Sequence, residues 1–407
     1  MRSLVHPLVE ERDRPRVDAT AATRGDLHVV LVAHDVHDGG GMERACAELI
    51  RRAPSDISFT VVSRTLGDDL RERVSWRRVP TPNRPFLLKY TVFFLLASLR
   101  LLRTRGLRHS VGAIVPNRVD VAAVHFCHAG YVARTRRLAP PGATPLRALN
   151  TAVTRIVSKL AERWCYRPGR VRALAAVSAG VAQELEAHFP NIPIVVTPNG
   201  VDVVRFPSVE DGRHSSAQTA GKPLIALFVG GDWDRKGLGP AIEGLAEARR
   251  LSDRRLELWV VGRGDERRFR RLAEHNGVSR NVRFFGFRGG VEQFYDAADV
   301  LVLPTLYEAD PLVVHEAAAA GLAIVVTRVN GVEELVGDDE AGFIVDRNAH
   351  AIGAALARLA VDEPLRLRQA AVARAKARAM SWERSTFGVV NLYRRLDEQS
   401  PAGNGRR

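Results

Sequence analysis

Two glutamates eight residues apart are the first candidates for chemistry in this sequence. Glu308 follows an apolar run, residues 300–304, that is short enough to be a buried strand, and Glu316 lies in the alanine-rich segment after it. In a parallel α/β sheet, the corner between a strand and the next helix is the crevice where ligands bind. Both carboxylates could face one ligand there. Alternatively, Glu308 is a solvated loop residue and Glu316 an ordinary helix residue.

The residues around this pair carry helix signals. Asp310 is a good N-cap, and Pro311 suits the first helical position, where an N–H has no partner in any case. Residues 316–320 have high helix propensity, and Gly321 is expected to end the helix. An apolar run at residues 323–327 predicts a second buried strand. The segment therefore reads as a strand–helix–strand unit, and a glycine turn with two acids follows at residues 330–334.

Two adjacent cations follow another apolar run. Residues 224–229 are expected to be a strand, and Gly230 and Gly231 lead from it to Arg235 and Lys236. No Walker loop is present, because the pattern G-x-x-x-x-G-K-[ST] does not occur. A guanidinium fork beside an ammonium suits a diphosphate. The alternative is a solvated basic turn.

A run of three glycines lies near the start of the chain. Residues 27–33 predict a buried strand, which leads to Gly39, Gly40 and Gly41 and then to a helix from Met42. Glycine at this place lets backbone amides approach an anion at a helix N-terminus. The spacing is not that of the dinucleotide fingerprint. A plain turn explains the glycines equally well when they are taken alone.

Two histidines follow a further predicted strand. We expect paired core strands at residues 111–115 and 121–124, with His125 and His128 just beyond the second. A histidine at the carboxyl end of a strand can hydrogen-bond a sugar hydroxyl or a developing charge. A satisfied structural histidine is the alternative. Metal binding by the pair is not expected, because no third ligand is suggested nearby.

The net charge of +14 is concentrated in one part of the chain. Residues 73–172 hold 20 basic side chains and two acids, Asp120 and Glu162. A field of this sign attracts phosphate-bearing surfaces, which include anionic lipid, lipid-linked diphosphates and nucleic acid. Part of the excess could reflect genome composition, because 55 of the 60 basic residues are arginine. Genome composition does not explain why these hundred residues contain only two acids.

Residues 86–102 form an apolar segment that contains Lys89 and Arg100. It is slightly short for a bilayer span, and its charges argue against one. A helix packed on the sheet of its own domain, or one lying at a membrane face, fits better.

The composition is that of a globular protein, with 46% hydrophobic and 26% charged residues among 407. Three widely spaced cysteines give neither a zinc pattern nor a disulfide framework, which suits a reducing compartment. Residues 1–25 have no apolar core of the kind found in a signal peptide. The length allows two α/β domains, each with its own core.

Together these motifs resemble the retaining glycosyltransferases of family 4, which have the GT-B fold. The spaced glutamates and the N-G-x-x-E pattern at residues 330–334 carry the resemblance in the second half. Gly-Gly-x-Glu-Arg at residues 40–44 and Pro-Asn-Gly-Val-Asp at residues 198–202 carry it in the first. Residues 308–311 read Glu-Ala-Asp-Pro where the family usually has Glu-Gly-Phe-Gly. The Glu-Ala start is similar to the lipopolysaccharide core glucosyltransferase branch.

The resemblance covers roughly residues 26–397 and implies an α/β fold of the GT-B type, with two doubly wound Rossmann-like domains facing a cleft. The expected parts are a disordered leader at 1–25, an N-terminal Rossmann-like acceptor domain at 26–207, a linker at 208–223, a C-terminal Rossmann-like nucleotide-sugar domain at 224–380, a helix at 381–398 that crosses back to the N-terminal domain, and a disordered tail at 399–407.

The reaction that the resemblance implies is transfer of a hexose from a UDP- or GDP-linked sugar to a glycan, glycolipid or lipid-linked acceptor. No cofactor and no metal are expected, because cations of the protein neutralise the diphosphate. Glu316 would hold the ribose, Glu308 the sugar or its diphosphate end, and His125 the reacting face. The expected catalytic residues are His125, Glu308, Arg235 and Lys236, and the expected donor-binding residues are Gly40, Gly41, Gly231, Arg235, Lys236, Glu308, Leu312, Val313 and Glu316.

The expected location is the cytoplasm, peripheral on the inner face of the plasma membrane, with residues 73–172 against anionic lipid. Two alternatives stay open. A nucleotide-sugar 2-epimerase has the same fold and differs in its product. A nucleic-acid-binding protein would need aromatic side chains among the basic ones for stacking, but only 6% of the residues are aromatic. We therefore do not expect nucleic acid as a partner.

Overall fold

The computed structural model describes residues 27–82, 86–141, 144–206, 222–337 and 339–400. The chain forms two compact units. The first unit comprises the described residues within Met1–Leu138, Leu149–Asn199 and Trp382–Arg407, and the second those within Ala139–Ala148 and Gly200–Ser381. The expected leader lies outside the described residues, as do residues 208–221 of the expected linker and residues 401–407 of the expected tail.

The first unit contains a parallel sheet of seven strands in the order β5-β3-β1-β6-β7-β8-β9. The order reverses between β1 and β6, as in doubly wound sheets. The central strands are apolar along their whole length because both faces of the sheet are covered, and Val29–Val32 are fully buried. The strands are β1 (Leu27–Val32), β3 (Ile57–Ser63), β5 (Val74–Arg78), β6 (Leu107–Val111), β7 (Val119–Val124), β8 (Val171–Ala176) and β9 (Ile194–Val196), and β2 (Asp35–Val36) pairs with β4 (Thr65–Leu66) beside the sheet.

The strand predicted at residues 111–115 is wrong. The strand is β6, which ends at Val111 and includes His109. His109 is 4% exposed, and its Nδ1 lies 2.5 Å from the Tyr393 hydroxyl. The hydrogen bond lets a polar ring occupy a core position, which the apolar pattern could not predict.

The second unit contains a parallel sheet of six strands in the order β12-β11-β10-β13-β14-β15. Here the order reverses between β10 and β13. The strands are β10 (Leu224–Val229), β11 (Leu256–Val261), β12 (Val282–Gly286), β13 (Val300–Leu303), β14 (Ala323–Thr327) and β15 (Gly342–Val345). The prediction of two doubly wound α/β domains is confirmed.

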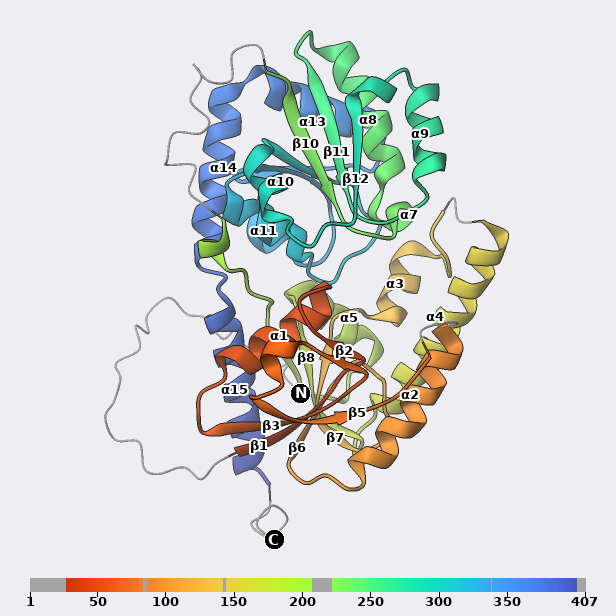
Figure 1. Cartoon of the computed structure of the whole chain (residues 1–407), viewed down its shortest axis with the longest axis vertical. Coiled ribbons are helices and arrows are strands. Elements are labelled where there is room, and N and C mark those ends of the chain that lie inside the picture. Colours follow the sequence, from red (N-terminus) through yellow and green to blue (C-terminus); the bar gives the residue numbers. More distant parts are fainter. Residues whose placement is uncertain (1–26, 83–85, 142–143, 207–221, 338, 401–407) are drawn as a thin grey trace, which may run out of the picture. The chain divides into compact units, whose positions relative to one another are not determined.

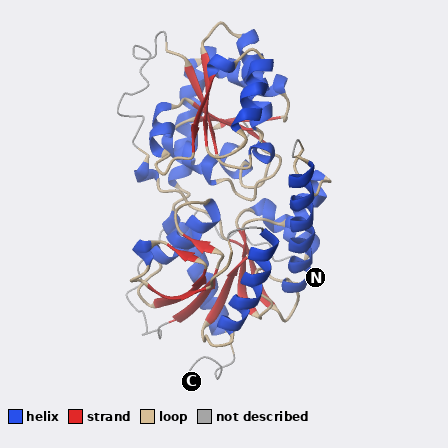
Figure 2. Ribbon diagram, turned by 45° about the vertical axis from the view of Figure 1, so that its right-hand side comes forward, coloured by secondary structure: helices blue, strands red, loops and turns tan. Residues whose placement is uncertain are grey.

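Helices accompany both sheets (Figures 1 and 2). The helices of the first unit are α1 (Gly41–Arg52), α2 (Phe86–Leu101), α3 (His128–Thr135), most of α4 (Pro145–Cys165), α5 (Ala179–His188) and α15 (Trp382–Glu398), with η1 (Asp68–Leu70). The helices of the second unit are α7 (Trp233–Lys236), α8 (Leu238–Leu251), α9 (Glu266–His275), α10 (Glu292–Ala297), α11 (Leu312–Ala320), α12 (Glu333–Val336), α13 (Ala349–Val361) and α14 (Glu363–Arg378), with η2 (Val203–Arg205) and η4 (Ser279–Asn281). Among the described residues, no helix is both long enough and apolar enough to cross a membrane.

The last helix, α15, packs with the first unit although it follows the second in sequence. Its Val390, Leu392, Tyr393 and Leu396 are buried in the core of the first unit. On the partly exposed side, the Arg52 guanidinium donates to Glu383 at 2.7 Å. Helix α15 therefore completes the core of the first unit.

Three expected boundaries differ from the contacts. Gly200–Phe206 were expected in the N-terminal domain, but they belong to the second unit. There the Val201 amide donates to the Met380 carbonyl at 2.7 Å, and the Phe206 ring packs edge-on against Tyr295. Ala139–Ala148 also belong to the second unit. Ser400, expected in the disordered tail, is ordered by a hydrogen bond to the Leu396 carbonyl.

Candidate functional site

The carboxyl ends of β10 and β13 meet where the strand order of the second sheet reverses. Ligands of doubly wound sheets bind at this edge. Strand β10 leads through Gly230 to the short helix α7, and β13 leads through residues 304–311 to α11. The fold therefore places the expected basic pair and the first expected glutamate next to each other.

Arg235 joins the two segments. Its Nη1 donates to Oε1 of Glu308 at 2.8 Å and to the Tyr307 carbonyl at 2.5 Å. Its Nε donates to Asp232 at 3.0 Å. The backbone adds a further link, because the Leu306 amide donates to the Arg235 carbonyl at 2.9 Å. The loop that carries Glu308 is thus fastened to α7 by side-chain and main-chain hydrogen bonds.

Lys236 contributes the second cation. Its Nζ lies 3.6 Å from Oε1 of Glu308, too far for a good hydrogen bond. The side chain folds against Gly230, where a Cβ would lie 2.9 Å from the lysine chain, so glycine leaves room for it. Gly231 is exposed, and its added Cβ would make only an ordinary contact. Gly230 is thus the glycine of this pair that the local packing requires.

The charges at this corner keep Glu308 ionised. Burial by itself would raise the pKa of the Glu308 carboxyl. The charges of Arg235 and Lys236 and the hydrogen bonds from Arg235 and Thr305 outweigh burial and hold that pKa below its usual value. Arg235 is bonded by two carboxylates, Glu308 and Asp232, whereas Lys236 lies 3.6 Å from Glu308, so an anionic ligand would meet chiefly the donors of Lys236.

A glycine fixes the junction behind this pair. Gly237 has φ +88°, and a Cβ there would lie 2.0 Å from the Pro304 carbonyl oxygen. Neither the backbone angle nor the space accepts another residue. Gly237 therefore allows α7 and the loop after β13 to touch.

Glu316 lies on α11 and is held separately. It is 7% exposed, and its Oε2 accepts a hydrogen bond from the Tyr295 hydroxyl at 2.7 Å. Leu312 and Val313, in the first turn of the same helix, are partly buried. Glu316 is thus held from α10, whereas Glu308 is held from α7.

The expected cap of α11 is wrong. The helix begins at Leu312 with Pro311 as its N-cap, and no side chain caps it. Asp310 instead accepts a hydrogen bond from Nε2 of His315 at 2.6 Å. The carboxylate is drawn to a buried partner one turn into the helix, which outweighs the local preference for capping. The expected end of the helix is confirmed, with Gly321 at φ +77°.

The expected residues of the first unit lie at the carboxyl edge of its own sheet. Gly40 is the N-cap of α1 and Gly41 its first residue. His125 follows β7 directly and is partly exposed, and His128 begins α3. Burial and the nearby Arg155 lower the pKa of His128 to about 3, so its ring is neutral at pH 7.

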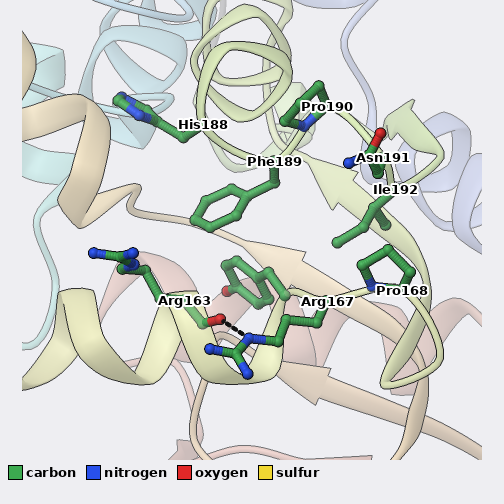
Figure 3. A pocket seen from close by; sticks show the side chains of 9 residues that line it. Arg163, Arg167, Pro168, His188, Phe189, Pro190, Asn191 and Ile192 are labelled. Atoms are coloured by element: carbon green, nitrogen blue, oxygen red, sulfur yellow. Dashed lines mark hydrogen bonds between the residues drawn. The ribbon is translucent and has the colours of Figure 1, made fainter.

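A pocket of about 250 Å³ lies at the opposite edge of the first sheet (Figure 3). It opens where α4 and α5 end and where β8 and β9 begin. Arg163 comes from the last turn of α4, where a cation complements the helix dipole, and His188 is the last residue of α5. The pocket is therefore explained by the local structure and lies away from the expected site residues. Its lining residues are Arg163, Tyr166, Arg167, Pro168, His188, Phe189, Pro190, Asn191 and Ile192.

Four features of the site were not predicted from the sequence. Tyr295 bonds Glu316 from another helix, and no local pattern marks it. Thr305 bonds Glu308 from three residues away, which its place after the strand could have suggested. The Asp310–His315 pair and Gly237 complete the set. Among the described residues, no group of three or more His, Cys, Asp or Glu side chains could hold a metal ion.

Two family models match the chain. The model described as "Glycosyl transferases group 1" matches residues 211–378, and "Glycosyltransferase Family 4" matches residues 39–205. Together the two matches take in most of the chain. Each match lies mainly within one of the two units, so each unit is matched by a glycosyltransferase model of its own.

Curated relatives share about a third of the aligned residues. D-inositol 3-phosphate glycosyltransferase of Geodermatophilus obscurus is 30% identical, covering 73% of this chain and 66% of its own length. Lipopolysaccharide glucosyltransferase WaaG of Escherichia coli K12 is 29% identical, covering 52% of this chain and 59% of its own length. The chain spans between about half and two thirds of the length of these relatives.

Solved structures share the fold. That of WaaG superposes with a TM-score of 0.73 at 21% identity, covering 90% of this chain and 99% of the other. Anabaena Alr3699/HepE, solved with UDP-glucose, superposes with a TM-score of 0.65 at 16% identity, covering 91% and 98%. At these identities the likeness establishes the fold alone.

Proposed function

We propose that this chain, which belongs to family 4 of the glycosyltransferases and has the GT-B fold, transfers a hexose from a nucleotide-diphosphate sugar with retention of anomeric configuration. The observation that carries the proposal is the cluster of Arg235, Lys236 and Glu308 at the switch point of the second sheet. A diphosphate is the group that such a cluster is suited to bind.

The proposed step breaks the bond between the anomeric carbon and the diphosphate, and the electron pair leaves with the diphosphate. A bond forms between that carbon and an acceptor hydroxyl oxygen, whose proton is released. Charge therefore grows on the leaving diphosphate, and fixed cations lower the barrier by stabilising it. Arg235 is already oriented by its bonds to Glu308 and Tyr307. Lys236 keeps ammonium donors that no described residue takes up.

The other proposed roles are those that the resemblance to family 4 implies. Glu316, on the helix after the loop, would hold the ribose, and Glu308 the sugar or its diphosphate end. In the first unit, His125 would approach the reacting face, and the amides of Gly40 and Gly41 would hold donor and acceptor groups. In this scheme the cations of the protein neutralise the diphosphate, and neither a metal nor another cofactor is required. The proposed donor is a UDP- or GDP-linked sugar, and the structures of HepE with UDP and with UDP-glucose support a nucleotide sugar of the UDP type.

A donor panel tests this proposal. UDP-, GDP- and ADP-sugars are screened by thermal shift, because a ligand bound only by the native state raises the melting temperature. We expect one UDP- or GDP-sugar to raise it clearly. Incubation with that donor and acceptor candidates, followed by NMR of the anomeric coupling constant, should show a retained configuration. A new nucleotide sugar formed without acceptor would indicate 2-epimerisation instead.

We further propose that the acceptor is a glycan, glycolipid or lipid-linked saccharide reached at the membrane surface. Helices α2 and α4 support this. Their only acid is Glu162, which is 2% exposed, while Leu95 and Leu160 are more than half exposed. Exposed apolar side chains on helices without exposed acids suit the interface of an anionic bilayer. The corresponding location is cytoplasmic, peripheral on the inner face of the plasma membrane.

Vesicle flotation tests the membrane proposal. The protein should bind vesicles of phosphatidylglycerol in low salt and leave them as salt rises, because screening weakens the attraction between residues 73–172 and the lipid. Leu160→Gln should weaken binding. Leu251→Gln, at the end of α8 in the second unit and 51% exposed, is the matched control and should not. Vesicle binding that changes neither with salt nor with Leu160→Gln would contradict the proposal.

A further inference from the structure

Asp310 and His315 form a buried pair next to the two site glutamates. The Asp310 side chain is 2% exposed and that of His315 is 0% exposed. The His315 Nε2 hydrogen points at Oδ1 of Asp310 over 2.6 Å, and a carboxylate can only accept this bond. Among the described residues, the other ring nitrogen, Nδ1, has no hydrogen-bond partner. Asp310 is therefore the anchor of this imidazole.

The pair bridges the two segments that carry Glu308 and Glu316. Asp310 lies on the loop two residues after Glu308, and His315 directly precedes Glu316 on α11. Pro311 stands between them with φ −77°, and its carbonyl accepts from the Val314 amide at 2.9 Å. A proline ring allows little rotation at this place. The Asp310–His315 hydrogen bond therefore constrains the segment between Glu308 and Glu316 across a turn that Pro311 makes stiff.

A glycine holds the pair from the other side. Gly331, in the turn after β14, has φ +78°. A Cβ at this glycine would lie 2.5 Å from Oδ1 of Asp310 and 2.7 Å from its Cα. The backbone of a third segment therefore presses directly on Asp310, and only glycine permits that approach. Asp310 has no room to take another rotamer without moving this turn.

We propose that Asp310 and His315 are positioning residues that fix the loop of Glu308 against α11 and so set the place of Glu308 for the donor. This inference rests on the proposed donor site. The bond of the pair joins the loop to α11, whereas Arg235 bonds Glu308 on the same loop. Its effect passes through the loop backbone, whose Leu306 amide is bonded to the Arg235 carbonyl. A displacement of about 1 Å at such a site is enough to cost a large factor in rate.

Three variants on one helix test the proposal. His315→Leu removes the bond at similar volume, and His315→Gln keeps a side-chain N–H that can reach Asp310. Val314→Ala is the matched control, because Val314 is equally buried on α11 and makes no side-chain bond to the loop. We expect His315→Leu to raise the KM for the donor at least tenfold with a smaller change in kcat. His315→Gln should stay within about threefold of the wild type, and Val314→Ala should leave the KM unchanged.

Hydrogen exchange gives a readout that does not depend on activity. In His315→Leu the amides of residues 304–311 should exchange faster, whereas Val314→Ala should leave them as in the wild type. Equal donor KM in wild type and folded His315→Leu would overturn the proposal, and so would equal losses in His315→Leu and Val314→Ala. If the wild type binds no nucleotide sugar, the proposed function fails, and unchanged exchange in His315→Leu would then still decide against the pair.

Discussion

Six strands of the first sheet, β5-β3-β1-β6-β7-β8, follow the same order as the six strands of the second, yet the two units bury histidine in opposite ways. In the first unit, burial lowers the pKa of His34 to about 4, with Lys89 adding to the effect. Burial likewise lowers the pKa values of His109 and His128 to about 3. In the second unit, burial alone would lower the pKa of His315, but the adjacent Asp310 outweighs it and raises that pKa.

The difference shows that burial does not decide the charge of a histidine by itself. His34 packs against the Phe93 ring, and His109 bonds the neutral Tyr393 hydroxyl. A carboxylate within hydrogen-bond distance reverses the outcome at His315. The first unit therefore buries neutral rings that resist protonation, and the second buries a pair that favours it.

Acid should produce the largest effect. Below about pH 6.5 the unfolded chain binds protons that the folded His34, His109 and His128 do not, so these three histidines lower the stability of the first unit as pH falls toward 4. Burial raises the pKa of Glu162 to about 7, which offsets part of this loss, so we expect the three histidines together to outweigh that one carboxyl. A pKa lowered from 6.5 to about 4 or about 3 corresponds to roughly 3–5 kcal/mol for a buried group. Hydrogen exchange followed by mass spectrometry should show β1 and β6 losing protection before β10 and β13. His109→Gln should reduce the loss, and earlier exchange in the second unit would contradict the comparison.

A glycine substitution in each unit should come next in size. Gly237→Ala meets both a left-handed backbone and the Pro304 carbonyl, and should lower the free energy of unfolding by about 2–4 kcal/mol. Gly388→Ala lies within α15 with nothing near its Cβ, and should raise that free energy by about 0.5–1 kcal/mol. Chemical denaturation of both variants measures the two effects. Similar losses in both would show that the space around these glycines does not decide their cost.

Loss of a site charge should come third. Lys236→Ala and Glu316→Ala should each lower turnover at least about tenfold, which corresponds to about 1.4 kcal/mol. Arg103→Gln removes an exposed cation of the first unit and is the control, with turnover of a soluble acceptor unchanged. Near-normal rates in either site variant would count against the donor site.

The smallest expected effect is a change in how stability depends on pH. Because the pKa of folded His315 is raised, its contribution to stability is complete below about pH 6.5 and is lost as pH rises through the raised value. Asp310→Asn keeps the acceptor but removes the charge, so burial should then dominate as it does in the first unit. Melting temperatures from pH 5 to 8 should show the slope of this contribution reversed. An unchanged slope would mean that Asp310 is not the cause.

The sequence predicts the second unit more fully than the first. Strands β10 and β14 have the same bounds as the apolar runs at residues 224–229 and 323–327, because continuous burial leaves a continuous pattern. Strand β6 was misplaced because His109 is buried through a partner 284 residues away. Long-range pairing of this kind leaves no local signal.

The candidate site follows the same rule. Arg235, Lys236 and Glu308 were expected together, since the ends of neighbouring parallel strands share one edge. The role of Asp310 could not be predicted, because its cap preference competes with a histidine whose burial only the fold creates. The sequence predicts Gly231 as a donor-binding residue, and the structure adds that the packing of Lys236 requires its neighbour Gly230. That choice depends on where the Lys236 side chain lies.

The position of α15 bears on how the protein is made. Because Val390, Leu392, Tyr393 and Leu396 complete the core of the first unit, the residues of that unit that are translated first lack part of their core until α15 has been synthesised. All the strands of the second unit precede α15 in the sequence, so they leave the ribosome before α15 does. Synthesis and completion therefore run in opposite orders, and a nascent chain stalled before Trp382 should present an open apolar surface to chaperones.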